Sequence, residues 1–214
     1  MFQPLRYIFV AAVCTSMQAA TITIDTTGVG SQAFIEFQLV KGSGDLDAPQ
    51  STVKLRNFVL TGASWGDVFD PTLGNAIGTT DGILTLNPGP ASFGSLADYV
   101  RALNIDGPSG QIVFSIEYAI TGIESPIPDR FTVLLLDPAL HPFPTLGPTG
   151  VEVAFSDFGS VQPQTLVFPG TNGTFNTRVS EAPEPSTVTL ILSGGLLVGV
   201  GCLRRRRGQL SSVS

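Results

Sequence analysis

Cysteine is nearly absent from this sequence, and its two copies lie far from the middle of the chain. Cys14 belongs to an apolar run near the N-terminus, and Cys202 belongs to a second apolar run near the C-terminus. The long stretch between them therefore has no disulfide and no cysteine-based zinc site. A domain without thiols suits an oxidising compartment, so this absence is consistent with export.

Histidine is scarcer still, because His141 is the single copy in the chain. It stands in a proline-rich segment at 138–144, where an exposed imidazole without a catalytic role is the ordinary interpretation. A multi-histidine metal site is therefore excluded, and the sequence around His141 does not indicate a His-dependent catalytic triad. The sequence also lacks a nucleophile elbow, a phosphate-binding loop and a dinucleotide fingerprint. We predict that the protein is not an enzyme and binds no cofactor.

Two pairs of carboxylates are close in sequence, Asp45 with Asp47 and Asp67 with Asp70. A carboxylate pair can hydrolyse a glycosidic bond, and Asp45 with Asp47 could also supply oxygen ligands to calcium, which takes roughly 6 to 8 of them. Aspartates in loops are more often turn residues, and no Asp-x-Asp-x-Asp-Gly loop completes a calcium set. We predict solvated turns here and no metal site.

Charged residues make up only 13% of the chain, whereas Gly and Pro number 24 and 16. Because helix-forming Glu, Lys and Gln are also sparse, this composition favours strands and turns. A length of 214 residues suits one ordinary domain with short appendages. We predict a single all-β domain.

The few basic residues are unevenly distributed along the chain. All 17 Asp and Glu residues lie between Asp25 and Glu184, where six Lys and Arg residues leave a net charge of −11. A surface this acidic repels phosphate backbones and anionic lipid headgroups. Nucleic acid is therefore excluded as a partner.

Apolar and polar residues alternate along several short segments. In the clearest, 111–120, one face carries Ile112, Phe114, Ile116, Tyr118 and Ile120, as in a half-buried strand. Weaker versions occur at 21–25, 33–40, 53–61, 83–86, 131–137, 151–155 and 165–168, while 99–105 suits either a strand or a short helix. Gly, Pro, Asp and Asn clusters separate the segments. They predict an antiparallel β-sandwich or jelly roll over 21–180, with a barrel as the alternative.

Residues 1–20 have the anatomy of a signal peptide: Arg6, then an apolar core at 7–14, then the small residues Ala19 and Ala20. The core is too short to cross a bilayer, which takes about 20 residues. We predict an N-terminal signal helix that is cleaved after Ala20, give or take two residues. Gln18 occupies the third position before this cleavage point, where a small residue is usual. The alternative is a lipoprotein modified at Cys14. The residue before this cysteine is Val13, where a lipoprotein usually has Gly or Ala, and this argues against the alternative.

The C-terminal residues are ordered as in a membrane anchor. A linker at 181–186 precedes an uncharged run at 187–203, which as a helix would reach about 25 Å, near the thickness of a hydrocarbon core. The basic cluster that follows consists of Arg204, Arg205, Arg206 and Arg207. We predict a transmembrane helix at 187–203, with the basic tail at 204–214 in the cytoplasm and the acidic domain outside.

A Pro-Glu-Pro tripeptide stands immediately before this apolar run. Its residues are Pro183, Glu184 and Pro185. Together with the short Gly-rich run and the arginine cluster, it resembles the PEP-CTERM sorting signal over about the last thirty residues. The resemblance implies that an exosortase-type membrane enzyme recognises the tripeptide. It also implies that 187–203 is a temporary anchor and that Arg204 to Arg207 are a retention cluster. The bacteria that carry this signal typically make exopolysaccharide. The alternative is a plain single-pass anchor.

The middle domain is also similar, at 21–26, 33–38 and 82–87, to an uncharacterised group of PEP-CTERM secreted proteins with no established activity. Within it, Trp65 and the nearby Phe69 occupy an expected loop and offer rings on which a sugar could stack, although most aromatic residues serve the core. We therefore predict a structural surface or matrix protein associated with exopolysaccharide. The alternative is a carbohydrate-binding module delivered by the same route.

Overall fold

The computed structural model describes residues 18–42, 51–69, 76–88, 96–119, 129–158 and 165–181. The chain divides into two compact units, Met1–Glu181 and Ala182–Ser214, and all described residues belong to the first. Most of the expected signal peptide, the expected transmembrane helix at 187–203 and the basic tail lie outside the described residues. Within the described ranges, no helix has the length and hydrophobicity that crossing a bilayer requires.

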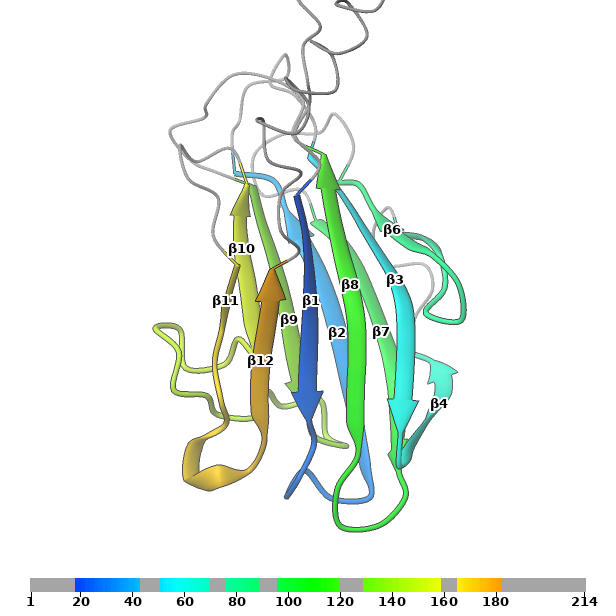
Figure 1. Ribbon diagram of the computed structural model, residues 1–214, viewed down its shortest axis with the longest axis vertical. Coiled ribbons are helices and arrows are strands. Elements are labelled where there is room, and N and C mark those ends of the chain that lie inside the picture. The colour runs from blue at the N-terminus through cyan, green and yellow to red at the C-terminus, as the bar shows by residue number, and fades with distance from the viewer. Residues whose placement is uncertain are drawn as a thin grey trace, which may run out of the picture. The chain divides into compact units, whose positions relative to one another are not determined.

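Two antiparallel sheets of six strands each pack face to face (Figure 1). Sheet 1 has the order β12 (Asn176–Glu181), β1 (Gln18–Asp25), β8 (Gln111–Ala119), β3 (Thr52–Thr61), β6 (Leu84–Leu86) and β5 (Ala76–Gly78). Sheet 2 has the order β11 (Thr165–Val167), β10 (Ala154–Phe158), β9 (Asp129–Leu136), β2 (Gln32–Val40), β7 (Leu96–Ile105) and β4 (Ala63–Val68). The described part also has one 3-10 turn, η1 (Thr171–Gly173). The sandwich prediction is therefore confirmed.

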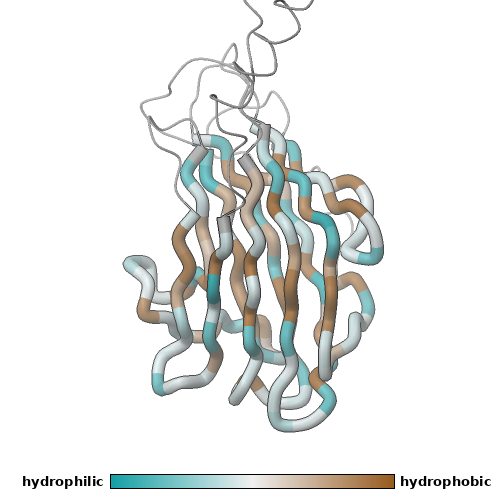
Figure 2. The backbone as a smooth tube through the Cα atoms, in the orientation of Figure 1, coloured by the Kyte–Doolittle hydropathy of each residue, from teal (hydrophilic) through white to brown (hydrophobic). Residues whose placement is uncertain are grey.

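The core lies between the two sheets and takes alternate residues from the long strands. Along β8, Ile112, Phe114, Ile116 and Tyr118 are all buried, as their alternation predicts. Hydrophobic and more polar stretches are interspersed along the strands of both sheets (Figure 2). The fully buried side chains include Ile22, Ile24, Ile35, Phe37, Leu39, Leu55, Phe114 and Phe131. Burial of each such side chain contributes about 1.5–3 kcal/mol.

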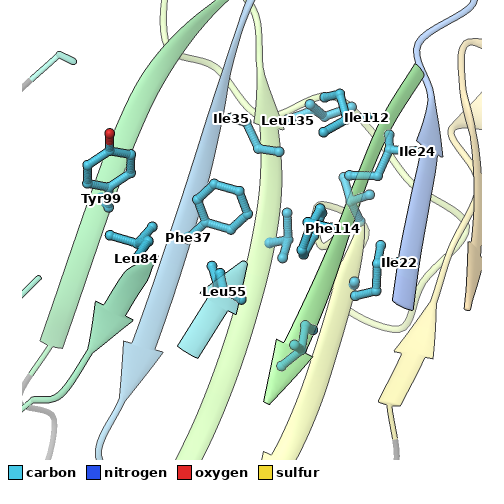
Figure 3. Close-up of a cluster of buried hydrophobic side chains, with 14 of the residues drawn as sticks. Ile22, Ile24, Ile35, Phe37, Leu55, Leu84, Tyr99, Ile112, Phe114 and Leu135 are labelled. Atoms are coloured by element: carbon cyan, nitrogen blue, oxygen red, sulfur yellow. The ribbon is translucent and has the colours of Figure 1, made fainter. Parts of the chain in front are cut away.

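Aromatic rings connect the two sheets at the centre of this core. Phe37 on β2 and Phe114 on β8 face each other edge to face, with ring centroids 5.4 Å apart (Figure 3). Phe58 on β3 stacks on Phe114 at 5.5 Å. Phe58 reaches this position because β3 has a register shift between Arg56 and Val59, which is the signature of a β-bulge.

The predicted strands differ from the observed ones in a few places. Segment 99–105 belongs to strand β7, because it pairs with β2 along the whole length of that strand. The strand expected at 151–155 lies instead at Ala154–Phe158. The segment around Trp65, expected as a loop, is strand β4. That expectation was wrong because β4 is defined by its pairing with β7, whereas its own sequence contains Gly66 and Asp67, which are typical of a turn.

The outer face of sheet 2 carries a small apolar cluster of its own. Val100, Leu134 and Leu136 are buried there, and Phe34 packs against them from β2. Leu140 and Val151, from the segment that follows β9, also pack on this cluster. One end of the outer face is therefore apolar, and Phe34 forms the boundary between this cluster and the neighbouring surface.

Candidate functional site

A groove with a volume of about 560 Å³ lies on the outer face of sheet 2, over strands β2, β7 and β4. Its lining includes Gln32 and Phe34 from β2, Ala102 and Asn104 from β7, and Asp67 and Phe69 from β4 and the residue after it. The volume is within the usual range for ligand sites, about 300–1,000 Å³.

The floor of the groove follows from the register of β2 and β7. Gln32 lies directly opposite Asn104, and Phe34 lies opposite Ala102. The intervening residues Ala33 and Leu103 are buried in the core. Because side chains alternate between the two faces of a strand, both cross-strand pairs project outward, side by side.

The wall of the groove is formed by a bulge in β4. Trp65 pairs with Leu103 and Val68 pairs with Arg101, so that Gly66 and Asp67 together oppose the single residue Ala102. A Cβ atom at position 66 would lie 2.9 Å from the Ala102 Cβ atom, which leaves room for glycine alone. The bulge therefore requires Gly66, and it places Asp67 at the edge of the groove.

Three polar side chains on the groove have no partner within the part of the chain that the structure describes. The Gln32 and Asn104 amides and the Asp67 carboxylate make no hydrogen bond or ion pair there. Each amide offers donors and an acceptor, whereas the carboxylate accepts only. Together they can bind a ligand that both donates and accepts hydrogen bonds.

Two phenylalanine rings give the groove an apolar side. The centroids of Phe34 and Phe69 are 5.6 Å apart with an interplanar angle of 74°. Phe34 is anchored by the apolar cluster on the same face, whereas Phe69 is 52% exposed. An edge-to-face contact covers at most one face of each ring, so Phe69 has apolar surface left for a ligand.

Trp65, the other aromatic residue expected to contact glycan, points to the opposite face of the sheet. It packs against the buried core, and its ring lies 5.8 Å from that of Phe58. The structure therefore does not bring Trp65 and Phe69 together: Phe69 lines the groove with Phe34, and Trp65 packs on the core side of the strand. In a regular strand, residues 65 and 69 would share a face. They lie on opposite faces because the bulge adds one residue between Trp65 and Val68.

Arg101 ties the bulge to the opposite sheet from inside the sandwich. Its Nε donates a hydrogen bond to the Gly66 carbonyl at 3.0 Å, and its Nη1 donates to Thr80 Oγ1 at 2.6 Å and to Asp81 Oδ2 at 2.8 Å. Its guanidinium also lies 5.2 Å from the Trp65 ring centroid. Thr80 and Asp81 lie between β5 and β6 of sheet 1, so Arg101 links the edges of both sheets.

Replacing Arg101 with alanine is expected to lower the free energy of unfolding by about 1–3 kcal/mol, because the Gly66 carbonyl and the buried Thr80 hydroxyl lose their donor. Asp81→Asn is the control, and it should cost less than about 1 kcal/mol because the Asp81 side chain is 60% exposed. Urea unfolding followed by circular dichroism measures both. Equal losses in the two variants would contradict a bridging role for Arg101.

No protein-family model, curated protein or solved structure matches this chain. Its function is therefore inferred from the groove and from the C-terminal motif.

The other residues considered from sequence do not gather into a site in the described part. His141 is 79% exposed, and its Nδ1 lies 3.6 Å from Asp137 Oδ2. The backbone N–H groups of His141 and Ala139 both donate to Asp137 Oδ1 at 2.8 Å, and the first of these bonds lowers the pKa of Asp137. Asp137 therefore orders the turn after β9.

Several expected residues lie outside the described ranges. They are Cys14, Asp45, Asp47, Asp70, Pro183, Glu184, Pro185, Arg204, Arg205, Arg206, Arg207 and Cys202. Among the described residues, no group of three or more His, Cys, Asp or Glu side chains is arranged to hold a metal ion.

Sequence reasoning missed three groove residues, Gln32, Phe34 and Asn104. Phe34 and Asn104 carried a usable signal, since both alternate with apolar residues that the pattern assigns to the core. That signal identifies an outward-facing side chain. It cannot show which outward-facing residues of separate strands become neighbours.

Proposed function

We propose that this chain is an exported bacterial cell-surface or extracellular-matrix protein, sorted by an exosortase-type enzyme through its C-terminal tail and associated with exopolysaccharide. The observation that carries the proposal is the order of the last thirty or so residues: Pro183 to Pro185, the uncharged run at 187–203 and the cluster Arg204 to Arg207. The signal-like residues 1–20 support export at the other end. Both ends thus favour the same route.

The proposed route has two stages. The helix at 187–203 first anchors the chain in the inner membrane, and the arginine cluster keeps the C-terminus in the cytoplasm. The acidic β domain is then outside the cytoplasm, and processing at the tail releases it to the cell surface or beyond. A sandwich whose core draws buried side chains from both sheets suits this location, because its stability does not depend on covalent links between strands.

We further propose that the sandwich is a jelly roll. The order β1-β8-β3-β6 in sheet 1 and the order β2-β7-β4 in sheet 2 support it, since successive strands alternate between the sheets from β1 to β4 and again from β6 to β9. Jelly rolls fold from two Greek keys in this manner, and lectin domains are among the proteins that use them. Fold alone does not specify a ligand.

The groove favours a second candidate function, a carbohydrate-binding module that is delivered by the same route. Two amides and a carboxylate that have no partner among the described residues lie beside an exposed ring. These are the groups that sugar hydroxyls and an apolar sugar face would use. Binding of soluble polysaccharide to the purified protein tests this candidate independently of export.

Export is expected to leave a mature N-terminus at Thr21, within two residues. Strand β1 begins at Gln18, and its first three residues pair with Tyr118, Glu117 and Ile116 of β8. Cleavage after Ala20 would remove these pairs and leave β1 to start at Thr21. N-terminal sequencing of the exported protein measures the site. A first residue of Met1, or a diacylglyceryl group on Cys14, would contradict the signal-peptide assignment.

A further inference from the structure

We propose that the groove on the outer face of sheet 2 binds an uncharged polysaccharide, with one sugar ring stacked on Phe69 and hydroxyl groups hydrogen-bonded to Gln32, Asn104 and Asp67. This inference rests on the second candidate function, and it adds the site and the class of glycan. It moves the glycan contact from Trp65, which faces the core, to residues that face solvent.

The polar groups of the groove match a ligand rich in hydroxyls. A sugar hydroxyl both donates and accepts, so it can bind the amides of the Gln32 and Asn104 pair and the Asp67 carboxylate at once. A carboxylate acceptor makes shorter and stronger hydrogen bonds than a neutral one. A purely apolar ligand would leave all three groups without partners.

The apolar part of the groove matches a flat ring. Phe69 is 52% exposed, and its contact with Phe34 at 5.6 Å covers at most one of its faces. Phe34 packs against the apolar cluster of Val100, Leu134 and Leu136 on the same face, so Phe69 contacts a ring that is held in place. A pyranose presents C–H groups on one face and hydroxyls around its rim, and these match the ring and the polar groups respectively.

Charge decides the class of glycan. Among the described residues, the groove lining contains Asp67 and no Lys or Arg, and residues 25–184 carry a net charge of −11. Arg101 reaches the groove residue Gly66 from the inner side of the sheet, and its guanidinium donates hydrogen bonds to Gly66, Thr80 and Asp81. Uronate or sulfate groups would meet an acidic surface with no counter-charge, so the groove favours an uncharged chain.

The test is affinity electrophoresis of the full-length protein in detergent through gels that contain galactomannan, which is uncharged, or alginate, which is a polyuronate. Retardation is expected in galactomannan and not in alginate. Phe69→Ala should weaken galactomannan binding roughly tenfold, the value of one good ring contact. Phe69→Trp should preserve binding, because the larger ring keeps the stacking surface.

Two matched controls keep loss of the site distinct from loss of the fold. Val59→Ala removes an apolar side chain that is 56% exposed on sheet 1, and Asp106→Asn removes an exposed carboxylate beyond the groove. Both should leave the retardation unchanged, whereas Asp67→Asn should reduce it. Circular dichroism of each variant should match that of the parent.

The outcomes separate the inference from the function on which it rests. No retardation in either gel overturns both the glycan-binding candidate and the site. Retardation in galactomannan that Phe69→Ala and Asp67→Asn leave unchanged overturns the site alone. Retardation in alginate equal to or greater than that in galactomannan overturns the class of glycan alone. None of these results bears on export, which the processing of the two termini tests.

Discussion

Replacing Phe114 with alanine is expected to lower the free energy of unfolding by about 3–5 kcal/mol. Phe114 is fully buried, and its ring meets Phe37 of the opposite sheet at 5.4 Å and Phe58 of its own sheet at 5.5 Å. The substitution removes contacts in both directions and leaves a cavity that the two sheets cannot close without shifting. A domain typically has only about 5–15 kcal/mol in total, so the variant should be close to unfolding.

Val113→Ala is the matched control, one residue earlier on the same strand. Val113 is partly buried on the outer face, so its truncation should cost less than about 1 kcal/mol. Urea unfolding can be followed by the fluorescence of Trp65, the single tryptophan, whose ring contacts Phe58 at 5.8 Å. If the two variants lose similar stability, Phe114 does not have the central position in the core that the ring contacts indicate.

The long strands could be predicted from sequence because their pattern is local. In β8 every second residue from Ile112 to Tyr118 is apolar, and that alternation by itself identifies the buried face. Strand β4 has no such pattern, since Gly66 and Asp67 interrupt it. Its existence depends on pairing with β7, which is distant in sequence, so a local pattern could not reveal it.

The groove was only partly predictable for the same reason. The sequence singles out Phe69 as an aromatic residue that a ligand could contact, and its side chain is exposed at the groove. Its neighbours Phe34 and Asn104 come from β2 and β7, and their proximity depends on the register between strands. The position of Trp65 against the core could not be predicted, because the sequence of an expected loop does not show which face a side chain takes in a strand.

The C-terminal motif leads to the prediction with the largest expected effect on function. Replacing Pro183, Glu184 and Pro185 with alanine, in a host that has an exosortase-type enzyme, should leave the whole protein uncleaved in the inner membrane. The parent protein should be released from that anchor. The prolines matter because they lack amide donors and favour extended backbone, which keeps the segment outside the helix and accessible to an enzyme at the membrane surface.

A plain single-pass anchor predicts a different result for the same substitution. Membrane insertion depends on the apolar run at 187–203 and on the arginine cluster after it, and it gains almost nothing from three residues outside the bilayer. Under that model the parent and the alanine variant remain in the membrane equally. The triple substitution therefore separates processing from anchoring.

The matched control changes Arg204 to Arg207 to serine and leaves the tripeptide intact. Loss of the four charges should weaken the orientation and retention of the chain under either model, because positive residues hold the cytoplasmic end. Cell fractionation locates each variant, and mass spectrometry of the C-terminus shows whether Ser214 is retained. If the parent and the alanine variant both keep Ser214 and both stay in the membrane, sorting by the tail is excluded and the chain is a single-pass surface protein.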